Sequence, residues 1–254
     1  MQIKVLGCSG GVGPGLRTTS LLIDDEILID AGTGVCDLSL AQMRVIRDVF
    51  ITHSHLDHVC GLAFMADNLF DLIDRPVRVH ATAETLAALR DHLFNWKLWP
   101  DFSKLPDEKN PLLTWQELKT GVANKVNGFT ITGFPVLHTV PGIGYAVQGK
   151  EGVFAFSGDT FACDDLWQGL NALERLDKLM IEVAFTNDDS ELARVSRHFV
   201  PALLGEELQK LRHRPKLYLT HHKPGCEAII EKECRLSLTG WDYHHLSRGD
   251  IISL

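Results

Sequence analysis

Short apolar runs ended by glycine, aspartate or histidine recur along the chain, with amphipathic stretches between them. Apolar runs of this length, bounded by turn residues, are typical of buried strands, whereas amphipathic stretches favour helices. Strands are predicted at residues 2–6, 21–23, 26–30, 49–51, 77–80, 128–134, 144–148, 153–156, 178–183, 217–220 and 250–254. Helices are predicted at residues 38–46, 59–72, 83–93, 164–175, 188–195, 202–212 and 224–234. This order predicts an α/β (α+β) fold in which two sheets pack face to face with helices outside.

The strand predicted at residues 49–51 leads into Thr52-His53-Ser54-His55-Leu56-Asp57-His58. Alternate residues at a strand end point to the same side, so His53 and His55 can bind one metal ion. Asp57 and His58 then turn the other way and can serve a second ion. Neutral imidazole and carboxylate are ligands that zinc and similar divalent ions prefer. A surface histidine cluster is the alternative, but this spacing at a strand end favours a metal site.

Three further residues at the ends of predicted strands can complete such a site. His138 can supply a third imidazole to the first ion, and Asp159, which follows the strand at 153–156, can bridge two ions. Asp30 can either fix the tautomer of a ligating histidine or cap a turn. The following histidines are expected to be structural or to lie at the surface: His80, His92, His244 and His245.

The glycine-rich loop at residues 7–15 resembles two functional motifs, but neither a nucleophile elbow nor a P-loop is supported. Gly7-Cys8-Ser9-Gly10-Gly11 matches G-x-S-x-G, but a nucleophile elbow needs a helix directly after it, and a strand is predicted here instead. The loop also lacks the Gly-Lys-Ser/Thr ending of a phosphate-binding P-loop. We therefore expect a flexible loop whose glycines let the backbone approach a site, where Arg17 can meet a phosphate.

The composition narrows the possible partners and compartments. The 254 residues carry a formal net charge of −8, which argues against a broad nucleic-acid surface but not against a small phosphate ester beside metal ions. No apolar run is long enough to span a membrane, and the first residues start directly as a strand, so a cytoplasmic location is expected. The six cysteines lack C-x-x-C spacing and are expected to be free thiols.

In order and spacing, a set of motifs across the whole chain resembles the metallo-β-lactamase superfamily. This resemblance implies an αββα sandwich, formed by a single domain over residues 1–254 with an aromatic- and proline-rich insertion at about 94–118. The insertion is interpreted as covering the site or making a subunit contact, with core filling as the alternative. The motifs are His53-x-His55-x-Asp57-His58, His138, Ser157-Gly158-Asp159-Thr160 and His221.

The same resemblance implies a hydrolytic site with two metal ions between the sheets. By similarity, one ion would be held by three imidazoles, the other by a second set of three ligands, and a carboxylate would bridge them. The first ion takes His53, His55 and His138, the second takes Asp57, His58 and His221, and Asp159 is the bridge.

Within the superfamily, the chain is most similar to the class II cyclic-nucleotide phosphodiesterases. Two departures from that family, at residues 63–67 and at His222, leave the metal ligands intact but leave the natural substrate open. The similar stretches are His55-Leu56-Asp57-His58, Phe94-Asn95 with Trp99-Pro100, Ile181-Glu182, Ser196-Arg197-His198 with Pro201, and His221-His222-Lys223-Pro224.

This similarity implies hydrolysis of a 3′,5′-cyclic nucleotide, such as cyclic AMP, to the 5′-nucleotide by a metal-bridging hydroxide. The departing ribose oxygen needs a proton, and His198, held by Glu182, is the candidate general acid. Asp57 is counted as catalytic as well as a ligand. In the alternative interpretation, Glu182 caps a turn and His198 lies at the surface.

Other functions of the same scaffold stay open. A transfer-RNA 3′-end processing endonuclease would need a basic surface and usually a flexible arm, neither of which is evident. A thioesterase or lactonase would not need His198, and a non-catalytic metal sensor is disfavoured because all the ligands are present. Zinc is the expected metal, with manganese or iron compatible with the same ligands. The expected partner is a small phosphodiester, without membrane or nucleic acid, and a homodimer is compatible with the resemblance.

Overall fold

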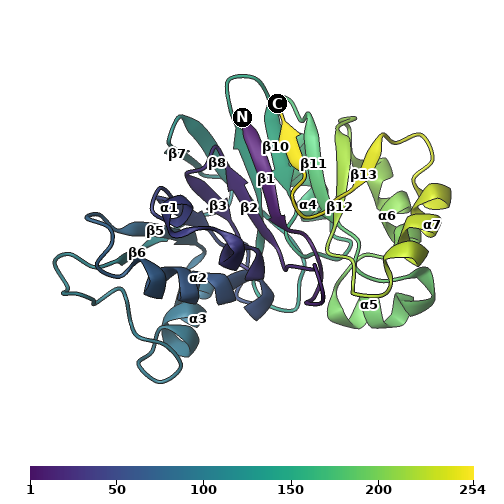
Figure 1. Ribbon diagram of the computed structural model, residues 1–254. Coiled ribbons are helices and arrows are strands. Elements are labelled where there is room, and N and C mark those ends of the chain that lie inside the picture. The colour runs from purple at the N-terminus through teal and green to yellow at the C-terminus, as the bar shows by residue number, and fades with distance from the viewer.

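Two seven-stranded sheets face each other at the centre of the protein, with helices on the outer faces of both (Figure 1). The computed structural model describes all of residues 1–254. The predicted αββα sandwich is therefore confirmed. None of the helices is both long and apolar enough to cross a membrane.

The first sheet is built mainly from the N-terminal half of the chain. Strands β3 to β6 run parallel, whereas β14, β1, β2 and β3 are joined as antiparallel neighbours. Its spatial order is β14 (Ile251–Ser253), β1 (Gln2–Gly7), β2 (Ser20–Ile23), β3 (Ile27–Ile29), β4 (Asp48–Phe50), β5 (Val77–Ala81) and β6 (Leu113–Glu117).

The second sheet has a similar division into antiparallel and parallel parts. Strands β7 to β10 form an antiparallel meander, and β10 to β13 run parallel. Its spatial order is β13 (Tyr243–His245), β12 (Lys216–Thr220), β11 (Lys178–Glu182), β10 (Val153–Phe156), β9 (Ile143–Gln148), β8 (Phe129–Pro135) and β7 (Ala123–Val126).

The helices cover the two outer faces and leave one end of the sandwich to loops. Helix α2 packs with the first sheet, whereas α4, α6 and α7 pack with the second. The bounds are α1 (Leu40–Met43), α2 (Leu56–Leu69), α3 (Ala83–Ala88), α4 (Asp164–Ala172), α5 (Ser190–Ser196), α6 (Pro201–Glu207) and α7 (Glu227–Ser237).

Three apolar clusters account for this layered packing. The central cluster joins inward-facing residues of both sheets, such as Phe50, Tyr145 and Phe156. A second cluster lies between the first sheet and α2, and a third between the second sheet and its helices. Strands buried on both faces read as continuous apolar runs, which is why Val153–Phe156 was predicted with its observed bounds.

Several elements differ from the prediction. The helix predicted at residues 38–46 is only one α-helical turn, Leu40–Met43, which begins at a capping box formed by Ser39 and Gln42. A 3₁₀ turn that was not predicted, Thr33–Asp37, precedes it. Helix 83–93 is α-helical to Ala88 and continues as a π turn, and helix 202–212 ends in a 3₁₀ turn.

The segment at residues 94–118 contains a strand that was not predicted. Strand β6 forms its C-terminal part and pairs in parallel with β5. Phe94, Phe102 and Leu112 belong to the cluster around α2, and the Trp99 indole donates a hydrogen bond to the carbonyl of Ala63. These residues therefore fill the core on the outer side of the first sheet, which was the alternative interpretation for this segment.

Strand β13 was also not predicted, and it corrects the expectation for one histidine. His245 pairs with Leu219 of β12, and its Nδ1 lies 2.8 Å from Nε2 of His222. His245 is therefore half-buried rather than a surface residue, whereas His244 is exposed as expected. His80 is buried against Asp48, so of the two expectations for it, structural or at the surface, the structural one holds.

Candidate metal centre

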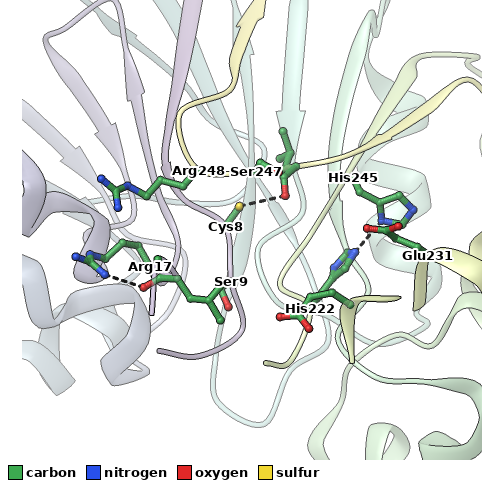
Figure 2. Close-up of a pocket in the computed structure, with 12 residues that line it drawn as sticks. Cys8, Ser9, Arg17, His222, Glu231, His245, Ser247 and Arg248 are labelled. Carbon is green, nitrogen blue, oxygen red and sulfur yellow. Dashed lines mark hydrogen bonds between the residues drawn. The ribbon is translucent and has the colours of Figure 1, made fainter. Parts of the chain in front are cut away.

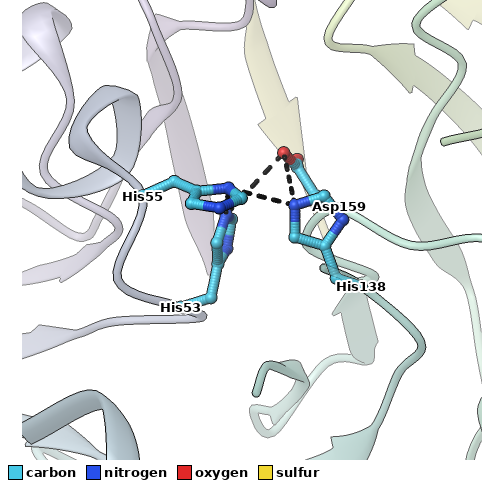
Figure 3. Close-up of side chains that lie close together, drawn as sticks. All are labelled: His53, His55, His138 and Asp159. Atoms are coloured by element: carbon cyan, nitrogen blue, oxygen red, sulfur yellow. Dashed lines mark hydrogen bonds and ion pairs between the residues drawn. The ribbon is translucent and has the colours of Figure 1, made fainter. Parts of the chain in front are cut away.

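The first donor group combines the end of β4 with two loops of the second sheet. His53 and His55 follow β4, His138 follows β8, and Asp159 follows β10. Their ligand atoms all lie within 4.8 Å of one another. Figure 3 shows the three imidazoles and the carboxylate pointing into one space; Nδ1 of His55 lies 3.0 Å from Nε2 of both His53 and His138.

The second donor group shares Asp159 with the first. It consists of Asp57 and His58, which begin α2, Asp159, and His221, which follows β12. Asp159 Oδ2 lies 3.3 Å from Nε2 of His58 and 3.3 Å from Nε2 of His221. The same oxygen lies 3.8 Å from Nε2 of His53, so one carboxylate faces both groups.

Buried polar atoms without partners indicate what this cluster is built to hold. Nε2 of His58, Nε2 of His221 and Oδ1 of Asp159 are buried and have no hydrogen-bond partner. Buried polar atoms in folded proteins are nearly always paired. Imidazole nitrogens and carboxylates that converge in this way fit divalent metal ions, so the residues suit such a cofactor.

Hydrogen bonds on the far side of the rings fix their tautomers. The Thr52 hydroxyl donates to Asp30, so it must accept from Nδ1–H of His53. His58 donates its Nδ1–H to the Asp30 carboxylate at 2.7 Å, and Asp30 also accepts from the Thr52 amide. Both rings therefore present the Nε2 lone pair to the centre, as a metal ligand must.

A similar hydrogen bond fixes His138. Its Nδ1–H donates to the carbonyl of Arg197 at 3.2 Å, and the Arg197 guanidinium donates back to the carbonyl of His138. Arg197 ends α5 with φ of 57°, and this left-handed turn directs its carbonyl toward His138. Thr52 and Arg197 were not predicted as site residues, because both act through backbone or hydroxyl groups that carry no motif.

Burial favours the neutral form of four of the imidazoles, whereas at His58 the carboxylates of Asp159 and Asp30 outweigh burial and raise the pKa well above its ordinary value. Desolvation lowers the pKa of His138 to about 4, and burial followed by the proximity of His58 lowers the pKa of His53 well below its ordinary value. Burial alone would raise the pKa of Asp159, but His221 and His58 outweigh it and hold that pKa well below its usual range. Neutral imidazoles around a charged carboxylate are the protonation states that a metal site requires.

A histidine–glutamate pair lies beside the donor groups. Nδ1 of His198 lies 2.7 Å from Oε1 of Glu182, and the His198 ring stacks on His221 with centroids 5.3 Å apart. Glu182 is fully buried at the end of β11 and also accepts from the amides of Thr160 and Phe199. Burial lowers the pKa of His198, but Glu182 outweighs this and raises it overall. His198 is therefore not a surface residue.

The glycine-rich loop approaches the centre through its backbone, as predicted. A Cβ at Gly10 would lie 2.4 Å from the carbonyl oxygen of His221, so only glycine fits there. The His221 amide donates to the carbonyl of Cys8, and Nζ of Lys223 donates to that of Gly10. His221 itself has φ of 67°, so these contacts hold it in a left-handed conformation.

Arg17 lies outside both donor groups. It forms an ion pair with Asp37 at 2.9 Å and lines a cavity of about 420 Å³, whose opposite wall is formed by His222 and His245 (Figure 2). A role for Arg17 toward a phosphate in the metal centre therefore has no support in the geometry. All seven residues predicted to bind metal do lie in the two donor groups.

Comparison with known protein families identifies the superfamily of this chain. A family model described as the beta-lactamase superfamily domain matches residues 25–222, and the chain belongs to this superfamily. The predicted family is thus confirmed.

The individual proteins to which the chain is similar share less than a third of their residues with it. The chain is 27% identical over 253 residues to a probable 3′,5′-cyclic-nucleotide phosphodiesterase of Yersinia pestis, covering 83% of this chain and 72% of that protein. It is 28% identical to a 3′,5′-cyclic-nucleotide phosphodiesterase of Aliivibrio fischeri, covering 81% and 74%. A ribonuclease Z of Archaeoglobus fulgidus is 29% identical over 58% of this chain and 47% of that one. Unliganded yeast PDE1 has the same fold, with a TM-score of 0.82, 18% identity, and coverage of 100% and 99%.

Proposed function

We propose that this protein is a two-metal-dependent phosphodiesterase that hydrolyses 3′,5′-cyclic nucleotides, with cyclic AMP as the first candidate, to 5′-nucleotides. One observation carries the proposal: Asp159 faces two donor groups at once, and the His198–Glu182 pair lies directly beside them. The relatives named as cyclic-nucleotide phosphodiesterases support the same substrate class.

The metal ligands in this proposal are the two donor groups. His53, His55 and His138 would hold one ion, Asp57, His58 and His221 the other, and Asp159 would bridge them. Two divalent ions supply a Lewis acid for the phosphoryl oxygens and a water of lowered pKa. Zinc suits these ligands best, and manganese or iron can occupy the same ligand set.

His198 is proposed as the general acid for the departing ribose oxygen. Its Nδ1 is engaged by Glu182, so Nε2 is the nitrogen available to hand a proton to that oxygen. Glu182 orients the ring and stabilises its charged form, while the amides of Thr160 and Phe199 fix the carboxylate. Of the seven donors, only His55 and Asp57 are half-buried, and the others are buried. Asp57 would orient the attacking water through its second oxygen.

A second candidate is an endonuclease of the ribonuclease Z type, which the partial match to that family favours. The formal net charge of −8 weighs against it, because RNA binding rests mainly on neutralising phosphates with basic side chains. The remaining parts of our proposal are a small-molecule partner, a cytoplasmic location and a homodimeric assembly.

The decisive experiment uses protein stripped of metal and reloaded with zinc or manganese. We expect metal-dependent conversion of 3′,5′-cyclic AMP to 5′-AMP, with no cleavage of a precursor transfer RNA assayed beside it. Cleavage of the RNA alone would establish the second candidate. Inactivity on both substrates, with two metal ions bound per chain, would overturn cyclic AMP as the substrate and direct the search to other phosphodiesters, thioesters and lactones.

A further inference from the structure

A basic groove lies at the end of the strands opposite the metal centre. Two adjoining hollows of about 380 and 510 Å³ share Arg78 and Asn127 in their walls. They lie where β4 and β5 begin and along β6 and β7, the edge strands on the same side of the two sheets. The metal donors follow the other end of β4, so the groove is separate from that site.

Cationic side chains outnumber carboxylates in the groove. The cations are Arg47 and Arg75 in the smaller hollow, Lys125 in the larger one, and Arg78 between them. The carboxylates in the walls are Glu26 and Glu117. Asp48 neutralises Arg78 and Asp74 lies near Arg47, so the groove places three cations without ion pairs opposite the two carboxylates of its walls. Cations without ion pairs in a groove attract anions even in a chain whose formal net charge is −8.

Most of these cations have no partner in the protein. Arg47, Arg75 and Lys125 form no ion pair or side-chain hydrogen bond. Nη1 of Arg47 is buried without a hydrogen-bond partner. Burial and then the neighbouring Arg75 lower the pKa of Arg47, whereas Asp74 and Glu26 act against this without pairing with it. A buried guanidinium nitrogen without a partner is unusual, and an anionic ligand can supply that partner.

Arg78 is held in place between the hollows. Its Nε and Nη2 bind the two oxygens of Asp48 at 2.7 and 2.6 Å, and Asp48 is fully buried and also binds His80. Nη1 of Arg78 has no partner in the protein, so the fixed guanidinium still offers donors. A guanidinium with a fixed orientation suits phosphate, which it binds through paired hydrogen bonds.

We propose that this groove binds a small organic bisphosphate or polyphosphate. The cations are distributed over two hollows, so two phosphate groups can be neutralised separately, one near Arg47 and Arg75 and the other near Lys125. Arg78 lies within reach of both hollows and would bind either group. The combined space is far larger than one inorganic phosphate needs, and it leaves room for the organic part of the ligand.

Isothermal titration of the metal-loaded enzyme with fructose 1,6-bisphosphate, at low and at moderate salt, tests the proposal. We expect saturable binding that weakens with salt. Arg75→Gln and Arg47→Gln should each weaken it by about tenfold or more, since each removes a charge-assisted contact. The matched control is Arg90→Gln, an exposed arginine outside the groove, which should bind like the unaltered protein.

An Asp159→Asn variant separates the groove from the metal centre. Binding that survives in this variant but is weakened by Arg75→Gln supports the groove. Loss in Asp159→Asn with no effect of Arg75→Gln assigns the binding to the metal centre and overturns the proposal. Equal affinity in every variant, or no saturation in the unaltered protein, overturns it as well. Thermal unfolding of each variant without the probe checks that the fold is intact.

Discussion

The two donor groups of the metal centre are supported in different ways. In the second group, His58 is fully buried and held by Asp30, a buried carboxylate. In the first group, the far sides of His53 and His138 meet neutral oxygens, from the Thr52 hydroxyl and the Arg197 backbone. His55 of the first group is half-buried.

This difference predicts unequal metal affinities. A carboxylate behind an imidazole raises its basicity as a ligand more than a hydroxyl or carbonyl does. We therefore expect the second group to bind its ion more tightly than the first. The following substitutions test that comparison, from the largest expected effect to the smallest.

Asp159→Ala removes the carboxylate that both groups share. We expect the bound metal to fall below one ion per chain and the rate on cyclic AMP to fall by about a thousandfold or more. Metal analysis by mass spectrometry, together with a product assay, measures both. Retention of two ions per chain would show that the groups are independent.

His198→Ala removes the proposed proton donor without removing a metal ligand. We expect the turnover rate to fall by about 10²- to 10⁴-fold, with the metal content unchanged. Substrates with a leaving group that needs no proton, such as a p-nitrophenyl phosphodiester, should lose much less. An equal loss on both kinds of substrate would contradict the assigned role.

Asp30→Asn changes the direct support of the second group, and it reaches the first group only indirectly, through Thr52. Asparagine keeps the shape and tolerates the φ of 57° at this position, but it cannot accept the His58 proton as a carboxylate does. We expect the affinity for the second ion to fall by about 10- to 100-fold, with a smaller fall for the first ion. Metal titration against a competing chelator gives both constants. A matching loss at both ions would show that the two supports are equivalent.

Arg197→Gly weakens the support of the first group. The backbone carbonyl that accepts from His138 remains, whereas the guanidinium contact is lost, so we expect the first ion to bind only about fivefold more weakly. Glycine also relieves the left-handed backbone and should raise the melting temperature by about 2–4 °C. Asp71→Gly, at an exposed position with φ of 59°, is the control that should raise stability alone.

The positions of the seven donors along the chain explain which of them the sequence could predict. Four of the donors lie within residues 53–58, where local spacing at a strand end already indicates a metal site. His138, Asp159 and His221 are separated by tens of residues, and their grouping followed mainly from resemblance to a family. The supporting roles of Thr52 and Arg197 could not be predicted, because a hydroxyl and a backbone carbonyl gain such roles only through tertiary contacts.

The fold shows the same division between local and distant information. Strands buried on both faces, such as β10, have continuous apolar runs and were predicted well. The edge strands β6 and β13 were missed, because Leu113–Glu117 and Tyr243–His245 are partly exposed and contain mostly polar or mixed residues. Edge strands pair on one side only, so their sequences carry less of the apolar signal.

Three residues of the metal centre adopt left-handed backbone conformations, which are unfavourable for residues other than glycine: Asp30, Arg197 and His221. Each such residue costs about 1–3 kcal/mol, so the centre lowers the stability of the fold that carries it. Selection for thermal stability alone should therefore favour substitutions at these positions, and the resulting variants should have lower turnover rates. A thermostable variant that keeps full activity would have to draw its added stability from elsewhere, such as the exposed turn at Asp71.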